Sequence, residues 1–390
     1  MKKILVAALA TAFAAPAFAA TSNVDIYGRV AATYNVLNTD TSVAGQDKTL
    51  YQVSSDQSWI GFKGNEDLGG GLKAIYQLEV GFDVSGGNTN LTKAGSLSGA
   101  NTFIYRNTFV GLSSSDYGTV LLGKHDTPYK MATVKLDVFS NEPADYRNII
   151  GNVAGISVFA QRPGNVIAYV TPDISGFTGV AAYVAGNPAG NGTASNADAW
   201  SVAGMYSNGP IYATLAYEKQ NNVAGYTYYT GSTPATIALG TMDNHAWKAG
   251  VGYDFGPGKV GLIYEDATLD TTSSLGNTSR SAYMLDGAYN VTGNIVLKAS
   301  WGHLGSLSNT TTGGTGANSY AVGADYVFSK RTKLIAQYQK VVNDSSGTYG
   351  VNFGGGSSYY AVGNGGYSSG TTGAAGNDPS VFAVGMVHTF

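Results

Sequence analysis

A strict alternation between short and long connections is the feature that most constrains how this chain of 390 residues folds. Segments in which polar and apolar side chains alternate recur along its length, which is typical of β-strands. Seven short turn clusters lie at 65–70, 113–118, 172–176, 207–210, 255–258, 290–294 and 329–332. Eight longer polar loops lie roughly at 38–50, 85–102, 126–162, 187–197, 221–242, 269–278, 305–318 and 343–379. Seven turns and eight loops join sixteen strands.

Residues 72–80 illustrate one such strand. The side chains that share one face are apolar, and they are Leu72, Ala74, Tyr76, Leu78 and Val80. Lys73, Gln77 and Glu79 lie on the other face. A soluble sandwich turns its apolar face to a core, whereas a membrane barrel turns that face to lipid and its polar face to the lumen. Short turns at one end and long loops at the other favour the barrel, with an even strand count; one missed hairpin would give eighteen strands.

The chain ends inside a strand rather than in a polar tail. In residues 381–390, the alternate positions from Phe382 to Phe390 share one face, and Phe390 is the last residue. A last strand must pair with the first one if a membrane sheet is to close, because unpaired backbone groups are not tolerated in lipid. The sequence therefore predicts an all-β, transmembrane antiparallel barrel of sixteen strands.

Composition supports a membrane barrel. Only 12% of the residues are charged, about half the share of a soluble domain. The chain holds 54 glycines and 27 tyrosines, and beyond its first residues it has no apolar run long enough for a membrane helix. A secreted β-solenoid or adhesin is an alternative with a similar composition. The formal charge of −3 comes without a basic run, which argues against a nucleic-acid partner.

The first nineteen residues are predicted to be a signal peptide. Lys2 and Lys3 precede an apolar run over 4–13, and Ala17 and Ala19 are the small residues of a cleavage site. Cleavage after Ala19 leaves 20–390 as a single barrel with 20 basic and 25 acidic residues. The chain has no cysteine, which excludes disulfides, thiol nucleophiles and cysteine-bound metals.

Five stretches carry a resemblance to a known family, and they lie at 24–29, 61–69, 109–124, 328–332 and 385–390. In order and spacing the sequence resembles the general trimeric porins of Gram-negative bacteria, in the branch of β-proteobacterial and neisserial type. The resemblance implies a homotrimer in the outer membrane, in contact with lipid and lipopolysaccharide. It also implies passive diffusion of ions and small hydrophilic solutes, with no cofactor and no enzymatic activity.

The resemblance further implies a constriction formed by the third long loop, here 126–162, folded into the lumen. Three acids of this loop, Asp137, Glu142 and Asp145, are expected to face basic residues of the barrel wall. Arg29, Arg106 and Arg162 match basic wall positions of the family, and the alternation also places Arg29 on the polar face.

One wall position departs from the family pattern. Trp59 stands before Ile60, where an arginine is common, and the alternation turns Trp59 inward. This substitution argues against strong anion selectivity and favours a narrower pore.

Other functions leave different signs. A substrate-specific porin would bind its solute in the lumen, and an anchoring barrel would enclose a partner protein. Residues 118–124 have the spacing of a phosphate-binding loop, but His125 stands where serine or threonine is required. The four histidines have no metal-ligand spacing. The loop at 343–379 either moves freely or folds over the pore mouth.

Overall fold

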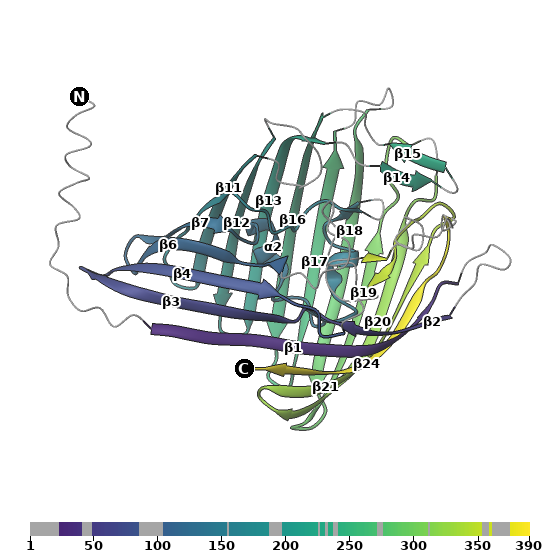
Figure 1. The fold of residues 1–390 in the computed structure, drawn as a ribbon. Helices are drawn as coiled ribbons and strands as arrows, with labels where there is room; N and C mark the ends of the chain where they lie inside the picture. The colour runs from purple at the N-terminus through teal and green to yellow at the C-terminus, as the bar shows by residue number, and fades with distance from the viewer. Residues whose placement is uncertain are drawn as a thin grey trace.

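The architecture is a closed antiparallel barrel (Figure 1). In this computed structural model the described residues are 23–40, 49–85, 104–153, 156–186, 197–224, 227–230, 233–236, 241–270, 276–310, 313–352, 359–360 and 375–390. The predicted signal peptide over 1–19 lies outside them. The main sheet has 18 hydrogen-bonded segments. Two pairs of these segments are each one interrupted strand, so sixteen strands form the wall.

The interrupted strands lie near the start of the chain. β2 (Thr49–Ser55) and β3 (Trp59–Gly69) pair with successive parts of β1 (Asn23–Asn38). β5 (Ile104–Tyr105) and β6 (Thr108–Ser114) both pair with β4 (Leu72–Gly81). The barrel closes where β1 pairs with β24 (Ser380–Thr389), from Arg29 opposite Thr389 to Asn38 opposite Ser380. The predicted strand count and closure are therefore confirmed.

The other wall strands follow in chain order around the barrel. They are β7 (Gly118–Lys124), β10 (Val166–Val170), β11 (Phe177–Ala185), β12 (Asp198–Asn208), β13 (Ile211–Ala224), β16 (Thr241–Asp254), β17 (Gly258–Leu269), β18 (Thr278–Asn290), β19 (Ile295–Leu304), β20 (Ala317–Ser329) and β21 (Thr332–Asn343). Small hairpins extend two long loops, β14 (Thr227–Thr230) with β15 (Thr233–Thr236) and β22 (Val351–Asn352) with β23 (Tyr359–Tyr360).

The two faces of the wall differ as the alternation predicts. On β12, Trp200 and Val202 are exposed, whereas Ser201 and Ala203 are buried. We call the exposed side the apolar face and the opposite side the polar face. Within the described residues no helix is both long and apolar enough to cross a bilayer.

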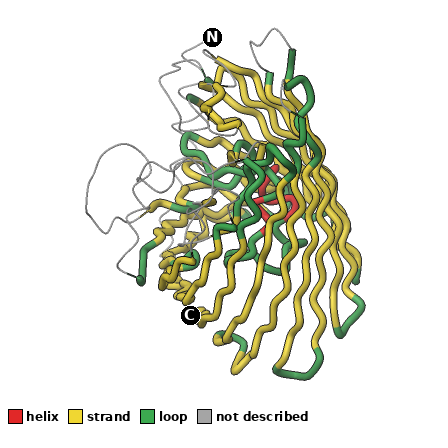
Figure 2. Tube along the Cα trace, turned by 90° about the vertical axis from the view of Figure 1, so that its right-hand side faces the viewer, coloured by secondary structure: helices red, strands yellow, loops and turns green. Residues whose placement is uncertain are grey.

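Several short turns lie together at the lower edge of the sheet in Figure 2, where they join neighbouring long strands. β12 and β13 are joined by two residues, and so are β3 and β4, where Gly70 and Gly71 have the positive φ angles that glycine adopts without strain. β3 continues to Gly69, past the predicted start of that turn at residue 65, because its pairing with β4 extends to Leu72. The end of a strand depends on its partner, which local turn residues do not show.

Candidate constriction site

The third long loop joins β7 to β10 and has its own local structure. α2 (Pro128–Thr133) begins after Thr127, whose hydroxyl accepts a hydrogen bond from the Lys130 amide at 3.3 Å, and proline occupies its first turn. η2 (Tyr146–Asn148) is capped by the carboxylate of Asp145. The hairpin of β8 (Asn152–Val153) and β9 (Ile156–Ser157) leads the chain back toward β10.

A row of four buried charges on the polar face meets this loop. Their signs alternate across adjacent strands, and we call the row the charge ladder: Glu218 on β13, Lys248 on β16, Glu265 on β17 and Arg280 on β18. Arg280 Nη2 lies 2.7 Å from Glu265 Oε1, and neither side chain is exposed to solvent. A buried pair of this kind holds its position strongly, because losing one partner leaves an uncompensated charge.

The loop hydrogen-bonds directly to the charge ladder. The Tyr129 hydroxyl donates to Glu265 at 2.6 Å, and the Gly151 amide donates to the same carboxylate at 2.9 Å. Arg280 Nε donates to the Asn152 carbonyl at 2.7 Å. One carboxylate on β17 therefore fixes both arms of the loop.

Lys248 contacts the loop in another way. Its ammonium lies 4.1 Å from the ring centroid of Tyr129 and 6.0 Å from that of Tyr146. It is fully buried and has no hydrogen-bond partner within the described part of the chain. Attraction to aromatic faces is strongest when water is excluded, so these two rings supply its main close contacts.

The middle of the loop is attached further along the barrel. Glu142 pairs with Lys298 on β19 and Lys333 on β21, each at 2.5 Å, and both lysines also pair with Asp325 on β20. Burial raises the pKa of Glu142, but the two lysines outweigh it and hold that pKa below its ordinary value. Of the three predicted loop acids, Glu142 is the one that these contacts join to the wall.

The other two predicted acids bond within the loop. Asp137 accepts hydrogen bonds from the amides of Phe139 at 2.8 Å and Tyr146 at 3.2 Å. Asp145 accepts from the Asn141 amide and from Arg147 Nε, both at 2.8 Å. Burial, with Asp145 and Asp286 nearby, raises the pKa of Asp137 well above its usual range. Burial also acts on Asp145, but Arg147 outweighs it and lowers that pKa.

Three of the predicted wall residues lie together on the strands opposite. Arg29 and Trp59 are cross-strand neighbours, with the guanidinium carbon 5.6 Å from the ring centroid. The guanidinium carbon of Arg106 lies 4.3 Å from the same ring. Arg29 donates to the backbone carbonyls of Asp56 and Gln57. The sequence therefore identified three residues that the fold brings into contact.

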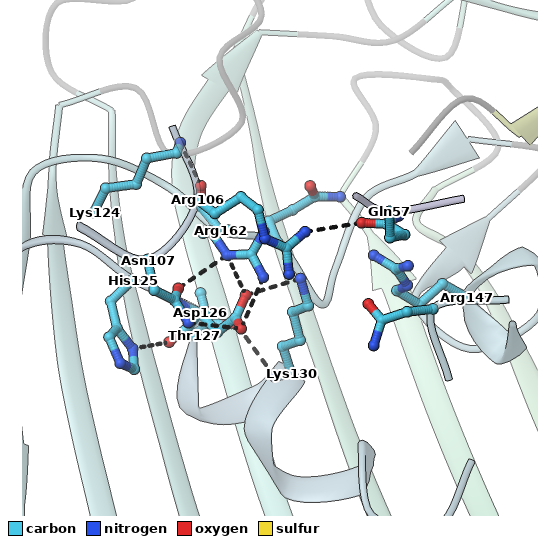
Figure 3. Close-up of polar contacts among 12 residues, drawn as sticks. Gln57, Arg106, Asn107, Lys124, His125, Asp126, Thr127, Lys130, Arg147 and Arg162 are labelled. Carbon is cyan, nitrogen blue, oxygen red and sulfur yellow. Dashed lines mark hydrogen bonds and ion pairs between the residues drawn. The ribbon is translucent and has the colours of Figure 1, made fainter. Parts of the chain in front are cut away.

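Arg106 and Arg162 join this group to the base of the loop (Figure 3). Arg106 bonds Glu79 Oε1 at 2.5 Å and Gln57 Oε1 at 2.8 Å. Arg162, the fourth predicted wall residue, comes from the end of the loop and pairs with Asp126 at 2.9 Å. It therefore approaches the wall from the loop and is not part of a strand.

Several residues of this group were missing from the sequence prediction. Asp126 pairs with Lys130 at 2.8 Å, one helical turn later, and Lys124 donates to the Arg162 carbonyl at 2.7 Å. Burial raises the pKa of Asp126, but Lys130 and Arg162 overcome it and leave it well below its usual range. Burial lowers the pKa of Lys130 to about 7. Of these residues, only Glu79 could have been placed on the lumen side from the sequence, since it follows Gln77 on the polar face of its strand.

Part of the last long loop also packs against the third. Tyr349 and Val351 are buried in the same apolar cluster as Tyr146. Asn148 Nδ2 donates to the Gly350 carbonyl at 3.3 Å. At least residues 349–351 therefore fold inward rather than move freely; most of 353–374 lies outside the described residues.

Comparisons with known proteins agree on one family. The Gram-negative porin family model matches residues 6–348. The major outer membrane protein P.IB of Neisseria gonorrhoeae is 30% identical over 358 residues, covering 86% of this chain and 92% of its own length. Among solved structures, the anion-selective porin from Comamonas acidovorans superposes with a TM-score of 0.73 at 24% identity, over 95% of this chain and 100% of that one. The trimer form of OmpT, an outer membrane protein of Vibrio cholerae, gives 0.64 at 15% identity, over 95% and 99%.

Proposed function

This chain belongs to the Gram-negative porin family and is an outer-membrane β-barrel channel for passive diffusion; we propose that its narrowest passage lies between the third loop and the wall residues Trp59 and Arg106. In this proposal residues 126–162 cross the lumen and narrow it. The passage then sorts solutes by size and by the charges that line it.

The attachment of the loop beyond its base to one side of the barrel carries this proposal. The charge ladder and the Glu142 contacts tie the loop to strands β17–β21 through buried, neutralised pairs. On the other side lie Arg29 on β1, Trp59 on β3 and Arg106 between β5 and β6. A loop fastened to one wall leaves its free side and the opposite wall to bound the open passage.

Charge at this passage favours anions. Its basic residues are Arg29, Arg106, Lys124, Lys130, Arg147 and Arg162, and its acids are Asp56, Glu79, Asp126 and Asp145. These six cations and four anions leave an excess of two positive charges. Within a low-dielectric channel such an excess concentrates anions and repels cations. A modest anion preference follows, and one solved structure that this chain is similar to is the anion-selective porin from Comamonas acidovorans.

The proposed assembly is a homotrimer without enzymatic activity. A trimeric form is described for one structural relative, and each barrel would then conduct independently. Lipid and lipopolysaccharide would contact the apolar face, where exposed aliphatic and aromatic side chains such as Trp200 and Leu215 stand.

Single-channel recording in a planar bilayer under a salt gradient tests this function. Conductance steps in groups of three, with a reversal potential on the anion side, are expected. A reversal potential that indicates cation selectivity would contradict the charge argument but would still be consistent with a diffusion channel. A correctly folded barrel that passes no current would contradict diffusion and favour the scaffold alternative.

A further inference from the structure

Trp59 is held in place from two sides. The guanidinium groups of Arg29 and Arg106 lie 5.6 Å and 4.3 Å from its ring centroid. Each arginine is itself fixed, Arg29 by backbone carbonyls and Arg106 by Glu79 and Gln57. An indole held this way has little side-chain entropy left to lose when a solute contacts it.

Trp59 and Arg106 are the partly accessible side chains of this wall. Trp59 is half-buried, whereas Arg29 is only 6% exposed. Gly81 lies directly across from Trp59 on β4, and a Cβ there would stand 3.6 Å from Arg106 Cδ. That distance is ordinary van der Waals contact, so Arg106 packs directly beside the backbone of β4 next to the indole.

Positive charge lies close to the ring on one side. Arg106 is near enough to Arg162 for the two charges to act on each other, and Lys130 and Arg162 share Asp126 (Figure 3). A solute that places a carboxylate toward these cations brings the rest of its body against Trp59. Aromatic rings attract each other in offset-stacked or edge-to-face geometry, so either an edge or a face of the indole serves.

We propose that Trp59 and Arg106 form a subsite that retains planar aromatic carboxylates within the passage. The carboxylate is drawn by Arg106 and Arg162, and the aryl ring rests on the indole. This inference rests on the proposed function, because the subsite requires an open passage along Trp59. It gives the pore a preference among anions of equal charge and similar size.

The test compares benzoate with cyclohexanecarboxylate as blockers of the chloride current through single channels. The two anions have the same charge and similar size, but only benzoate has an aromatic ring. Wild-type channels are expected to be blocked by benzoate at concentrations about two- to tenfold lower, which corresponds to one aromatic pair. We call the blocking concentration of cyclohexanecarboxylate divided by that of benzoate the blocking ratio. In Trp59→Leu this ratio should fall to one, whereas Trp59→Phe should keep most of the wild-type ratio.

A matched control is available on the apolar face. Trp200→Leu removes an indole that is 55% exposed there, and it should leave the ratio unchanged. Equal block by both anions in the wild type would overturn the subsite, and so would a ratio that survives in Trp59→Leu. Wild-type channels that conduct chloride but are blocked equally by the two anions would leave the proposed channel function intact. Folded wild type without chloride current would overturn both, and the wild-type ratio decides the matter even if Trp59→Leu does not fold.

Discussion

Two sides of the same barrel use charged residues for opposite purposes. On β13–β21 the charges lie under the third loop in opposite-sign groups, and Glu265 and Arg280 have no solvent exposure. On β1–β6 and at the base of the loop, cations outnumber acids, and the Arg106 side chain keeps 13% exposure. Charges are paired on both sides, so the depth of burial and the local balance of charge, rather than residue type, separate the charges that anchor the loop from those that would line the proposed passage.

The largest effect is expected on the anchoring side. Glu265→Ala removes the carboxylate that holds Tyr129, Gly151 and Arg280, and it leaves Arg280 buried without its ion-pair partner. Loss of one partner of a buried pair costs about 3–5 kcal/mol. Hydrogen exchange of the Gly151 amide, followed in the folded barrel, should become faster by roughly a hundredfold or more. Open-channel current should also become larger and noisier.

Lys259→Ala is the matched control for this change. Lys259 lies on the same strand, but its side chain is exposed and makes no hydrogen bond or ion pair with the third loop in the described part of the chain. Its removal should leave exchange at Gly151 unchanged. If Glu265→Ala behaved like Lys259→Ala, the charge ladder would not be what positions the loop.

The loop acids allow a finer division between anchoring and solute sorting. Glu142→Gln removes a charge that lies between Lys298 and Lys333, so the local balance gains one positive charge. Asp137→Asn changes a carboxyl that accepts hydrogen bonds from loop amides and whose pKa burial, with Asp145 and Asp286 nearby, raises well above its usual range. We expect the first variant to shift the reversal potential toward anions and the second to leave it nearly unchanged. Equal shifts would mean that Asp137 is ionised and faces the passage.

Acidity of the solution should change the charge at the base of the loop. Burial lowers the pKa of Lys130 to about 7, so its ammonium is present below that pH and is lost as the pH rises through it. Anion preference should therefore fall between pH 6 and pH 8, by the equivalent of about one charge. Reversal potentials at several pH values measure this. Lys130→Met should start at the lower preference and lose the part of the fall that Lys130 contributes, and a wild-type profile that matches that of Lys130→Met would contradict the lowered pKa.

The same two sides differ in how far the sequence predicts them. Turn spacing and alternating polarity predicted sixteen strands, because both signals are local and each strand pairs with its neighbour in the chain. The positions of Arg29 and Trp59 could also be predicted from the sequence, since alternation fixes the face of the strand on which each side chain lies. The contacts that anchor the third loop could not be predicted from the sequence. Tyr129 meets Glu265 from 136 residues away, and Glu142 meets Lys333 from 191 residues away.

Ion pairs across such distances leave no periodic pattern. Asp137, Glu142 and Asp145 look alike in the sequence, yet one reaches the wall and two cap the loop's own backbone. Their division depends on how the loop turns between Phe139 and Tyr146. Local propensity does not specify that path, because packing against β17–β21 determines it.

The smallest effect is expected at Trp59 itself. Trp59→Arg adds a third guanidinium beside Arg29 and Arg106. Mutual repulsion and partial burial would reduce the gain, so a shift of only a few millivolts toward anions is expected under a tenfold salt gradient, well below about 59 mV for ideal selectivity. Trp59→Gln, which removes the ring without adding charge, is the control. An unchanged reversal potential in Trp59→Arg, with both variants folded, would place Trp59 outside the passage and would move the narrowest point toward Arg162 and Lys130.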